Sequence, residues 1–145
     1  KLKHNANRRL LENKRVVLVD DSIVRGTTST KIVEMVRSAG AAEVHMRIAS
    51  PPTVHSCFYG VDTPERDQLL AANNDTAEMA KLIGVDSLSF VSIDGLYRAM
   101  GEARRNAEAP QFCDACLSGE YPIPLADHDD GGLPAQLSLL NENNG

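Results

Sequence analysis

The chain has 145 residues, of which 42% are hydrophobic and 24% are charged, and its formal net charge is −5. This length allows one domain, and the hydrophobic fraction excludes a fully disordered protein. The acidic balance and the absence of tryptophan argue against a nucleic-acid partner. No apolar run is long enough to span a membrane, and three cysteines are too few for a secreted disulfide framework. We therefore expect a cytoplasmic protein without a membrane partner.

Three short apolar runs have the length and β-branched content of buried parallel strands. They cover residues 15–20, 43–49 and 87–93. Helices are expected where apolar residues recur at helical spacing and where proline, aspartate or glycine marks an end. These helices cover residues 27–39, 64–72, 75–83 and 94–105, with Asp75 and Asp94 as the caps of the last two. The alternation predicts an α/β fold in which a parallel sheet is flanked by helices.

The stretch VVLVDDSIVRGTTST, residues 16–30, carries most of the chemical information. A strand ends in Asp20 and Asp21, and Gly26 with Thr27 and Thr28 leads into the next helix. Ligands of open parallel sheets bind beyond the carboxyl ends of the strands, and free N–H groups at a helix start bind phosphate. Adjacent carboxylates suit ribose hydroxyls or Mg²⁺. The pattern favours a ribose 5-phosphate site, although paired acids at a strand end also occur for structural reasons and in response regulators.

The same stretch resembles the phosphoribosylpyrophosphate (PRPP) motif of type I phosphoribosyltransferases. Two further segments extend the resemblance to the amidophosphoribosyltransferase family. They are SPPTVHSCFYGVDTPERDQLLAA at residues 50–72, and Asp94-Gly95-Leu96 leading to CDACLSGEYP at residues 113–122. The resemblance implies a partial type I phosphoribosyltransferase fold with an irregular C-terminal cysteine segment. It also implies a fragment of the enzyme that makes 5-phosphoribosylamine from PRPP and glutamine-derived ammonia, the first step of de novo purine biosynthesis.

The resemblance assigns PRPP binding to a short set of residues. They are Asp20, Asp21, Ser22, Arg25, Gly26, Thr27 and Thr28. Asp20 and Asp21 would contact the ribose hydroxyls and Mg²⁺, and residues 25–28 would hold the 5′-phosphate. The resemblance further implies purine nucleotides as feedback ligands and a homo-oligomeric parent, with no catalytic residue in this chain. A PRPP-binding regulatory protein and a salvage phosphoribosyltransferase are the alternatives.

The domain organisation follows from the order of segments in that family. The family's glutaminase domain, pyrophosphate segment and mobile loop all precede the PRPP motif, and this chain begins without methionine. We therefore expect residues 1–126 to be the C-terminal portion of a phosphoribosyltransferase domain and residues 127–145 to be a disordered tail. The N-terminal glutaminase domain is expected to be absent, and the chain alone is expected to be inactive.

The cysteines pose a separate question. Cys113 and Cys116 form a C-x-x-C pair, and Cys57 stands alone upstream. Such a pair favours a redox or metal site, and the irregular segment after it favours metal. The resemblance implies that all three cysteines bind a [4Fe–4S] cluster whose fourth ligand lies outside this chain. Zinc with His55 or His128, and three buried free thiols, are the alternatives.

Overall fold

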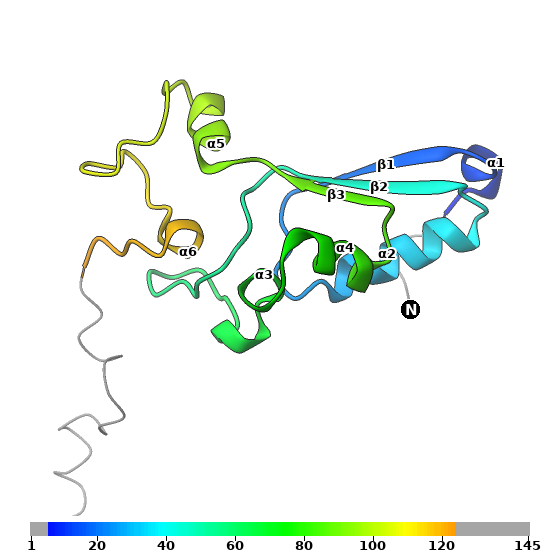
Figure 1. Cartoon of the computed structure of the whole chain (residues 1–145), viewed down its shortest axis with the longest axis horizontal. Coiled ribbons are helices and arrows are strands. Elements are labelled where there is room, and N and C mark those ends of the chain that lie inside the picture. Colours follow the sequence, from blue (N-terminus) through cyan, green and yellow to red (C-terminus); the bar gives the residue numbers. More distant parts are fainter. Residues whose placement is uncertain (1–5, 124–145) are drawn as a thin grey trace, which may run out of the picture.

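Three parallel strands form the centre of the computed structural model, which describes residues 6–123 (Figure 1). They are β1 (Arg15–Asp20), β2 (Glu43–Ile48) and β3 (Ser87–Phe90), in the spatial order β1-β2-β3. The middle strand pairs along its whole length with β1, and His45 to Ile48 pair with β3. Because every pair is parallel, the carboxyl ends of the strands meet at one edge of the sheet. The α/β fold class predicted from the sequence is confirmed.

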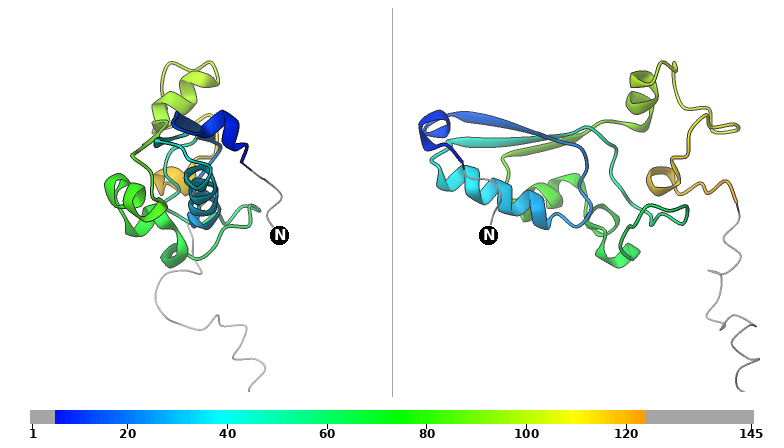
Figure 2. Two further views of the ribbon diagram at one scale, coloured as in Figure 1. Left: turned by 90° about the vertical axis from the view of Figure 1, so that its right-hand side faces the viewer. Right: turned by 180° about the vertical axis from the view of Figure 1, so that it is seen from behind.

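The helices lie on one face of the sheet and beyond its carboxyl edge, except α1, which lies at the amino end of β1 (Figure 1). They are α1 (Arg8–Leu11), α2 (Thr27–Ser38), the 3-10 helix η1 (Arg66–Gln68), α3 (Leu70–Asn73), α4 (Thr76–Ile83), α5 (Ile93–Ala99) and α6 (Ala115–Ser118). Figures 1 and 2 show α2 and α4 against the same face of the sheet, whereas α5 and α6 lie past the strand ends. The expected tail at residues 127–145 lies outside the described residues.

The core lies between the sheet and the pair α2 and α4. Alternate side chains of β2 point into it, as the strand period of two requires. The most buried core side chains include Val44, Met46 and Ile48 from β2, Val33 and Val36 from α2, and Met79 and Ile83 from α4. The helical spacing of Ile32, Met35, Val36 and Ala39 in the sequence indicates an inward face of α2 that contains these residues. The structure centres that face on Val33, while Ile32 is only partly buried.

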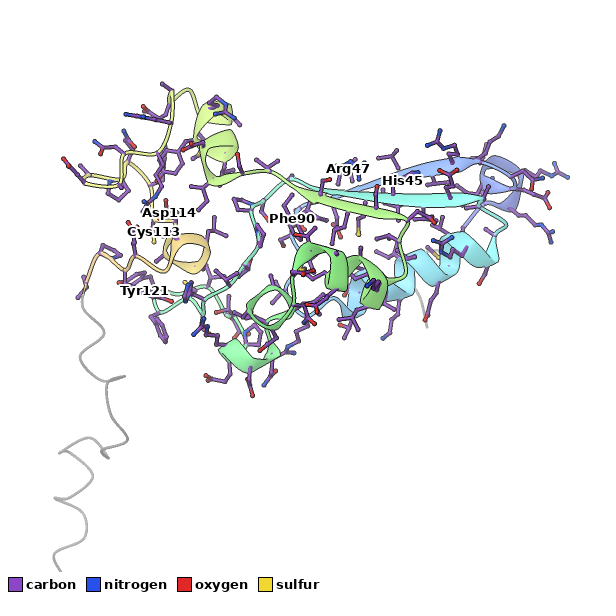
Figure 3. All side chains as sticks on the ribbon, viewed as in Figure 1. His45, Arg47, Phe90, Cys113, Asp114 and Tyr121 are labelled. Carbon is purple, nitrogen blue, oxygen red and sulfur yellow. The ribbon has the colours of Figure 1, made fainter. Side chains whose placement is uncertain are left out.

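The opposite face of the sheet is open within the described part of the chain. Val17 and Val19 of β1 are 59% and 76% exposed there. Figure 3 shows His45 and Arg47 of β2 on the side turned away from α2 and α4. His45 is held by contacts to Ser87 Oγ (2.8 Å) and Glu43 (2.9 Å). Of the helices between residues 6 and 123, none has the length and apolar content of a membrane span.

The prediction of a single helix over residues 64–72 is wrong. The chain instead forms η1 and then α3, with Leu69 extended between them (φ −77°, ψ 119°). The break has a tertiary cause, because Leu69 is fully buried and the N–H of Leu70 donates to the carbonyl of Val24 (2.8 Å). A continuous helix would direct that N–H into its own ladder instead.

The helix expected over residues 94–105 is also shorter than predicted and has a different cap. Strand β3 ends at Phe90, and Ser92 caps α5 by accepting the N–H of Gly95 (3.0 Å). The helix ends at Ala99, shortly before Gly101 takes a left-handed φ of 94°. Asp94 accepts the backbone N–H of Arg105 (3.1 Å) instead of capping the helix. The serine hydroxyl therefore satisfies the helix start, and the aspartate organises the following loop.

A surface carboxylate links α2, β2 and the turn before β3. Asp86 Oδ2 accepts the backbone N–H of Val44 (2.7 Å) and a bond from Arg37 Nη2 (2.8 Å). Arg37 Nε also donates to the carbonyl of Gly84 (2.9 Å). The backbone hydrogen bond from Val44 lowers the pKa of Asp86 most, and the bond from Arg37 lowers it further. The ionised form of Asp86 is therefore the one that stabilises this junction.

We expect Asp86→Asn to lower the free energy of unfolding at neutral pH but to have little effect in acid. Because the pKa of Asp86 is lower in the folded state, its stabilisation is complete above the unfolded pKa of about 4. It is lost as the pH falls through the folded value. The measurement is urea denaturation of both proteins from pH 6 down to about 2. Asp67→Asn, at an exposed aspartate, is the matched control, and a stability difference independent of pH would contradict the assignment.

Candidate functional site

A cavity of about 450 Å³ opens where β1 passes into α2, at the carboxyl edge of the sheet. Six of the seven residues predicted to bind PRPP line it. They are Asp21, Ser22, Arg25, Gly26, Thr27 and Thr28. The remaining lining residues are Ile23, Val24 and Ser29 from the same segment, and Asp62 and Pro64 from a later loop. The structure thus brings the predicted loop together around one space, which we call the loop cavity.

The two adjacent carboxylates lie in different surroundings. Asp20 is half-buried, and its Oδ1 accepts the backbone N–H of Asp21 (3.0 Å). Asp21 is exposed, and its Oδ1 accepts the backbone N–H of Ser22 (2.7 Å). Asp21 lines the loop cavity, whereas Asp20 is not among the described lining residues. The acidic pair therefore presents one carboxylate directly to the cavity and one at its margin.

The start of α2 has the features of an anion site. Gly26 is the N-cap residue and has no side chain to accept the first free N–H groups of the helix. Its carbonyl accepts both the N–H (2.9 Å) and the hydroxyl (3.0 Å) of Thr30, which fixes the first turn. Thr27, Thr28 and Arg25 are exposed beside it. Free N–H groups, two hydroxyls and a guanidinium thus converge on a place where a phosphate would complete the helix start.

The loop is held in shape from behind by the segment around α3. Gly26 has a left-handed backbone (φ 78°), and a methyl group added there would lie 2.7 Å from Leu70 Cδ2. The N–H of Leu70 bonds the carbonyl of Val24, and Ile23 is 2% exposed in the core. Two features therefore favour glycine at position 26: the backbone is left-handed, and Leu70 Cδ2 lies where a side chain would begin.

Asp62 and Pro64 are the lining residues that sequence reasoning missed. From the sequence alone, Asp62 is interpreted as a turn residue. Both lie far downstream of the loop along the chain, and no local pattern indicates that they approach it. Their only sequence signal is their place in the 50–72 segment, since spatial proximity to the loop requires the tertiary fold.

The three cysteines gather near α6. Cys113 is exposed, and Cys57 and Cys116 are half-buried. The carbonyl of Cys116 accepts the N–H groups of Val54 (3.1 Å) and His55 (3.0 Å), which ties the Cys57 segment to α6. Burial raises the pKa of the Cys116 thiol, and the neighbouring Cys57 and Cys113 thiols raise it further. The three thiols are therefore close enough to influence one another's ionisation.

The three thiols do not form a complete metal site within residues 6–123. In that range, no three His, Cys, Asp or Glu side chains are grouped so that they could hold a metal ion. His55, the zinc alternative, packs against Gly119. The other zinc candidate, His128, lies outside the described residues. Thiols have the right donor chemistry for an iron–sulfur cluster, but these three require further ligands and closer approach to form one.

A buried carboxylate anchors the cysteine segment, and sequence reasoning did not anticipate it. Asp114 is 4% exposed and accepts bonds from Tyr97 Oη (2.9 Å), Ser118 Oγ (2.8 Å) and Arg105 Nη2 (3.1 Å). Figure 3 shows Asp114 and Cys113 beside α6. Burial alone would raise the pKa of Asp114, but the hydrogen bonds from Arg105, Ser118 and Tyr97 outweigh it and lower the pKa. This network connects α5 to the turn that carries Cys113 and Cys116.

The relatives found by comparison with known proteins are amidophosphoribosyltransferases. The chain is 57% identical over 144 residues to an amidophosphoribosyltransferase of Rhizobium etli, covering 99% of this chain and 29% of that protein. It is 47% identical to the Bacillus subtilis amidophosphoribosyltransferase, covering 92% of this chain and 28% of the relative. The solved B. subtilis glutamine PRPP amidotransferase, complexed with ADP and GMP, aligns with a TM-score of 0.73 at 50% identity. That alignment covers 81% of this chain and 26% of the solved chain. No family model matches.

The parallel sheet, the acidic strand end and the loop cavity define the class as an α/β fold of the phosphoribosyltransferase type. Within it, the chain is homologous to a segment of the amidophosphoribosyltransferases, which confirms the resemblance expected from its motifs. The chain spans less than a third of the length of these curated relatives.

We expect Gly26→Ala to destabilise the protein more than Gly101→Ala does. Both glycines have left-handed backbones, but an added methyl at Gly101 meets nothing within 4 Å. The backbone cost is about 1–2 kcal/mol for each variant, and the contact with Leu70 adds about 1–3 kcal/mol for Gly26 alone. The measurement is the free energy of unfolding in urea. Equal losses in the two variants would show that Leu70 does not constrain the loop.

Proposed function

We propose that this chain is the PRPP-binding segment of an amidophosphoribosyltransferase, which uses glutamine-derived ammonia to convert PRPP into 5-phosphoribosylamine. The observation that carries the proposal is the loop cavity at the start of α2. Its N–H groups, hydroxyls and guanidinium face the same space as the Asp21 carboxylate. A ligand that satisfies both needs a phosphate at one end and hydroxyl groups nearby, as the ribose 5-phosphate portion of PRPP has.

In this proposal, different residues of the loop bind different parts of the ligand. Arg25, Thr27 and Thr28 hold the 5′-phosphate against the free N–H groups of α2. Asp21 accepts hydrogen bonds from the ribose hydroxyls, and Asp20 supports it from the end of β1. The reaction displaces pyrophosphate at C1 of the ribose, so the contribution of these residues is to fix the position of the sugar.

The site suits a Mg²⁺ ion that binds together with the phosphates of the ligand. Mg²⁺ is commonly bound by one or two carboxylates together with substrate phosphates rather than by a protein cage. Asp20 and Asp21 offer that number of carboxylates at the edge of the loop cavity. When bound, the ion would neutralise charge on the departing pyrophosphate.

The wider partners of the enzyme are part of the same proposal. The B. subtilis relative was solved with ADP and GMP, which supports purine nucleotides as ligands of the parent enzyme. Another matching structure is described as the allosteric regulatory enzyme of purine biosynthesis. A homo-oligomeric parent, a cytoplasmic location, the absence of nucleic-acid partners and the domain boundary near residue 126 stay predictions from the sequence.

We extend the proposal to the cysteines. Cys57, Cys113 and Cys116 would supply three ligands of a [4Fe–4S] cluster in the longer protein, and the fourth ligand would come from outside this chain. The support is the proximity of the three thiols to one another and the hydrogen bonds that hold Asp114, which lies between Cys113 and Cys116 in the sequence. The cluster would hold the Cys57 segment against the C-terminal segment, in addition to the backbone bonds to the carbonyl of Cys116.

We expect PRPP with Mg²⁺ to bind this chain, and Arg25→Ala to weaken the binding by at least about tenfold. A charge-assisted hydrogen bond is worth about 1.5–3 kcal/mol, which corresponds to one or two orders of magnitude in affinity. Asp21→Asn should weaken the dependence on Mg²⁺ as well as the affinity. The measurement is calorimetric titration of each variant with PRPP, with and without Mg²⁺.

The matched control is Arg9→Ala, since Arg9 is an exposed arginine on α1 at the opposite end of β1 (Figure 1). Its affinity for PRPP should equal that of the unchanged chain. The proposal is overturned if the unchanged chain shows no saturable binding, or if Arg25→Ala and Arg9→Ala behave alike.

The cluster proposal predicts a difference between this chain and the longer protein. A site with three thiolates leaves one iron exposed, so the chain purified in air should contain no stable cluster. The longer protein should contain iron and acid-labile sulfide in equal amounts, and Cys116→Ser in that protein should lose both. The measurement is iron and sulfide content per chain. A longer protein without either element would contradict the proposal.

A further inference from the structure

The loop that brings Asp62 and Pro64 to the loop cavity has a closed base. The N–H of Cys57 donates to Thr63 Oγ1 (2.7 Å), and Ser56 Oγ donates to the carbonyl of Pro64 (2.9 Å). We call these two hydrogen bonds the neck. Both cross between the same two short stretches, residues 56–57 and residues 63–64, so the chain between them forms a projecting loop.

The loop beyond the neck is exposed, and its first two residues contact the C-terminal segment. The ring of Phe58 lies 5.3 Å from that of Tyr121, and Tyr59 Oη donates to the carbonyl of Ile123 (3.3 Å). Residues 58–62 are exposed, and Gly60 at the tip has a left-handed φ of 109° with open space around it. The side chain of Asp62 makes no hydrogen bond within the described part of the chain. The four neck residues, in contrast, are half-buried. On the side of the loop that carries Asp62 and Pro64, the neck bonds are therefore the contacts that tie the loop to residues 56–57.

The neck itself is fixed to the body of the protein. Tyr121 Oη donates to the carbonyl of Ser56 (2.6 Å), and the N–H groups of Val54 and His55 bond the carbonyl of Cys116. One side of the neck is thus anchored to the C-terminal segment. The other side of the neck, Thr63 and Pro64, is held to residues 56–57 by the two neck bonds. In one bond the acceptor is the side-chain hydroxyl of Thr63, and in the other it is the backbone carbonyl of Pro64.

We propose that Thr63 is a positioning residue for the second wall of the loop cavity. Its hydroxyl oxygen accepts the Cys57 N–H and thereby holds the adjacent Asp62 and Pro64 opposite Arg25 and the start of α2. The inference rests on the proposed function, because it assigns Thr63 a role in binding the same ligand. The end of the cavity formed by Arg25, Thr27 and Thr28 belongs to a separate segment and does not depend on the neck.

Two variants at this position separate the hydroxyl from the shape of the side chain. Thr63→Val keeps the branched shape but removes the acceptor, and Thr63→Ser keeps the acceptor. Thr76→Val, at an exposed threonine in the first turn of α4, is the matched control. The probes are PRPP with Mg²⁺, which is long enough to reach the second wall, and inorganic phosphate, which fits the α2 end alone.

We expect Thr63→Val to weaken PRPP binding about fivefold, the loss that corresponds to one neutral hydrogen bond. Binding of inorganic phosphate should be unchanged, and Thr63→Ser should restore PRPP binding. Equal PRPP affinity in Thr63→Val and the unchanged chain would overturn the inference. Equal weakening of both probes would also overturn it, because that result indicates general disruption of the fold.

A second measurement tests the neck without any ligand. Amide hydrogen exchange at Cys57 should be several-fold faster in Thr63→Val than in Thr63→Ser or Thr76→Val. Unchanged exchange would overturn the positioning role even if PRPP affinity fell. If the unchanged chain failed to bind PRPP, the proposed function would fail, whereas the exchange result would still decide whether Thr63 holds the loop.

Discussion

The close approach of Leu70 to Gly26 is the contact on which the arrangement of the site depends. Gly26 ends the loop after β1 and begins α2 in a left-handed conformation that a side chain would strain. Leu70 occupies the space beside it, and its N–H fixes the carbonyl of Val24. The start of α2 and the shape of the loop therefore both depend on the absence of a side chain at Gly26.

The loop cavity has two walls of different origin. The wall formed by residues 21–29 is local, since β1 and α2 flank it directly in the chain. The wall formed by Asp62 and Pro64 depends on the neck at residues 56–57 and 63–64. The neck also connects to the cysteine segment through Tyr121 and the carbonyl of Cys116. The two chemically distinct regions of the molecule are thus joined by a short path of hydrogen bonds.

The region beyond the sheet is held by polar contacts more than by apolar packing. Tyr97 and Ala115 are its buried apolar residues, while Asp114 accepts bonds from three other side chains. A buried carboxylate with all its partners in place specifies one geometry, because the loss of any partner leaves a costly unsatisfied charge. This explains how a segment with little core of its own can keep Cys113 and Cys116 beside Cys57.

The sequence by itself determined the elements whose signals are local. The apolar run before Asp20 forms β1, the helix after Gly26 forms α2, and Asp75 caps α4 with a full capping box. Six of the predicted ligand residues therefore line one cavity, because they all lie between residues 21 and 28, in the loop after β1 and the start of α2. The prediction from the motif therefore agrees with the structure where the local backbone alone determines the positions of the side chains.

Tertiary structure decided the features that depend on residues far apart in the chain. Burial of Leu69 and the Leu70–Val24 bond replaced the expected helix over residues 64–72 with two short pieces. The Asp94–Arg105 bond and the left-handed Gly101 shortened the helix expected over residues 94–105. Asp62 entered the cavity wall for the same reason. Local sequence patterns describe only neighbouring residues, whereas burial and hydrogen-bond satisfaction are settled by the packing of the whole fold.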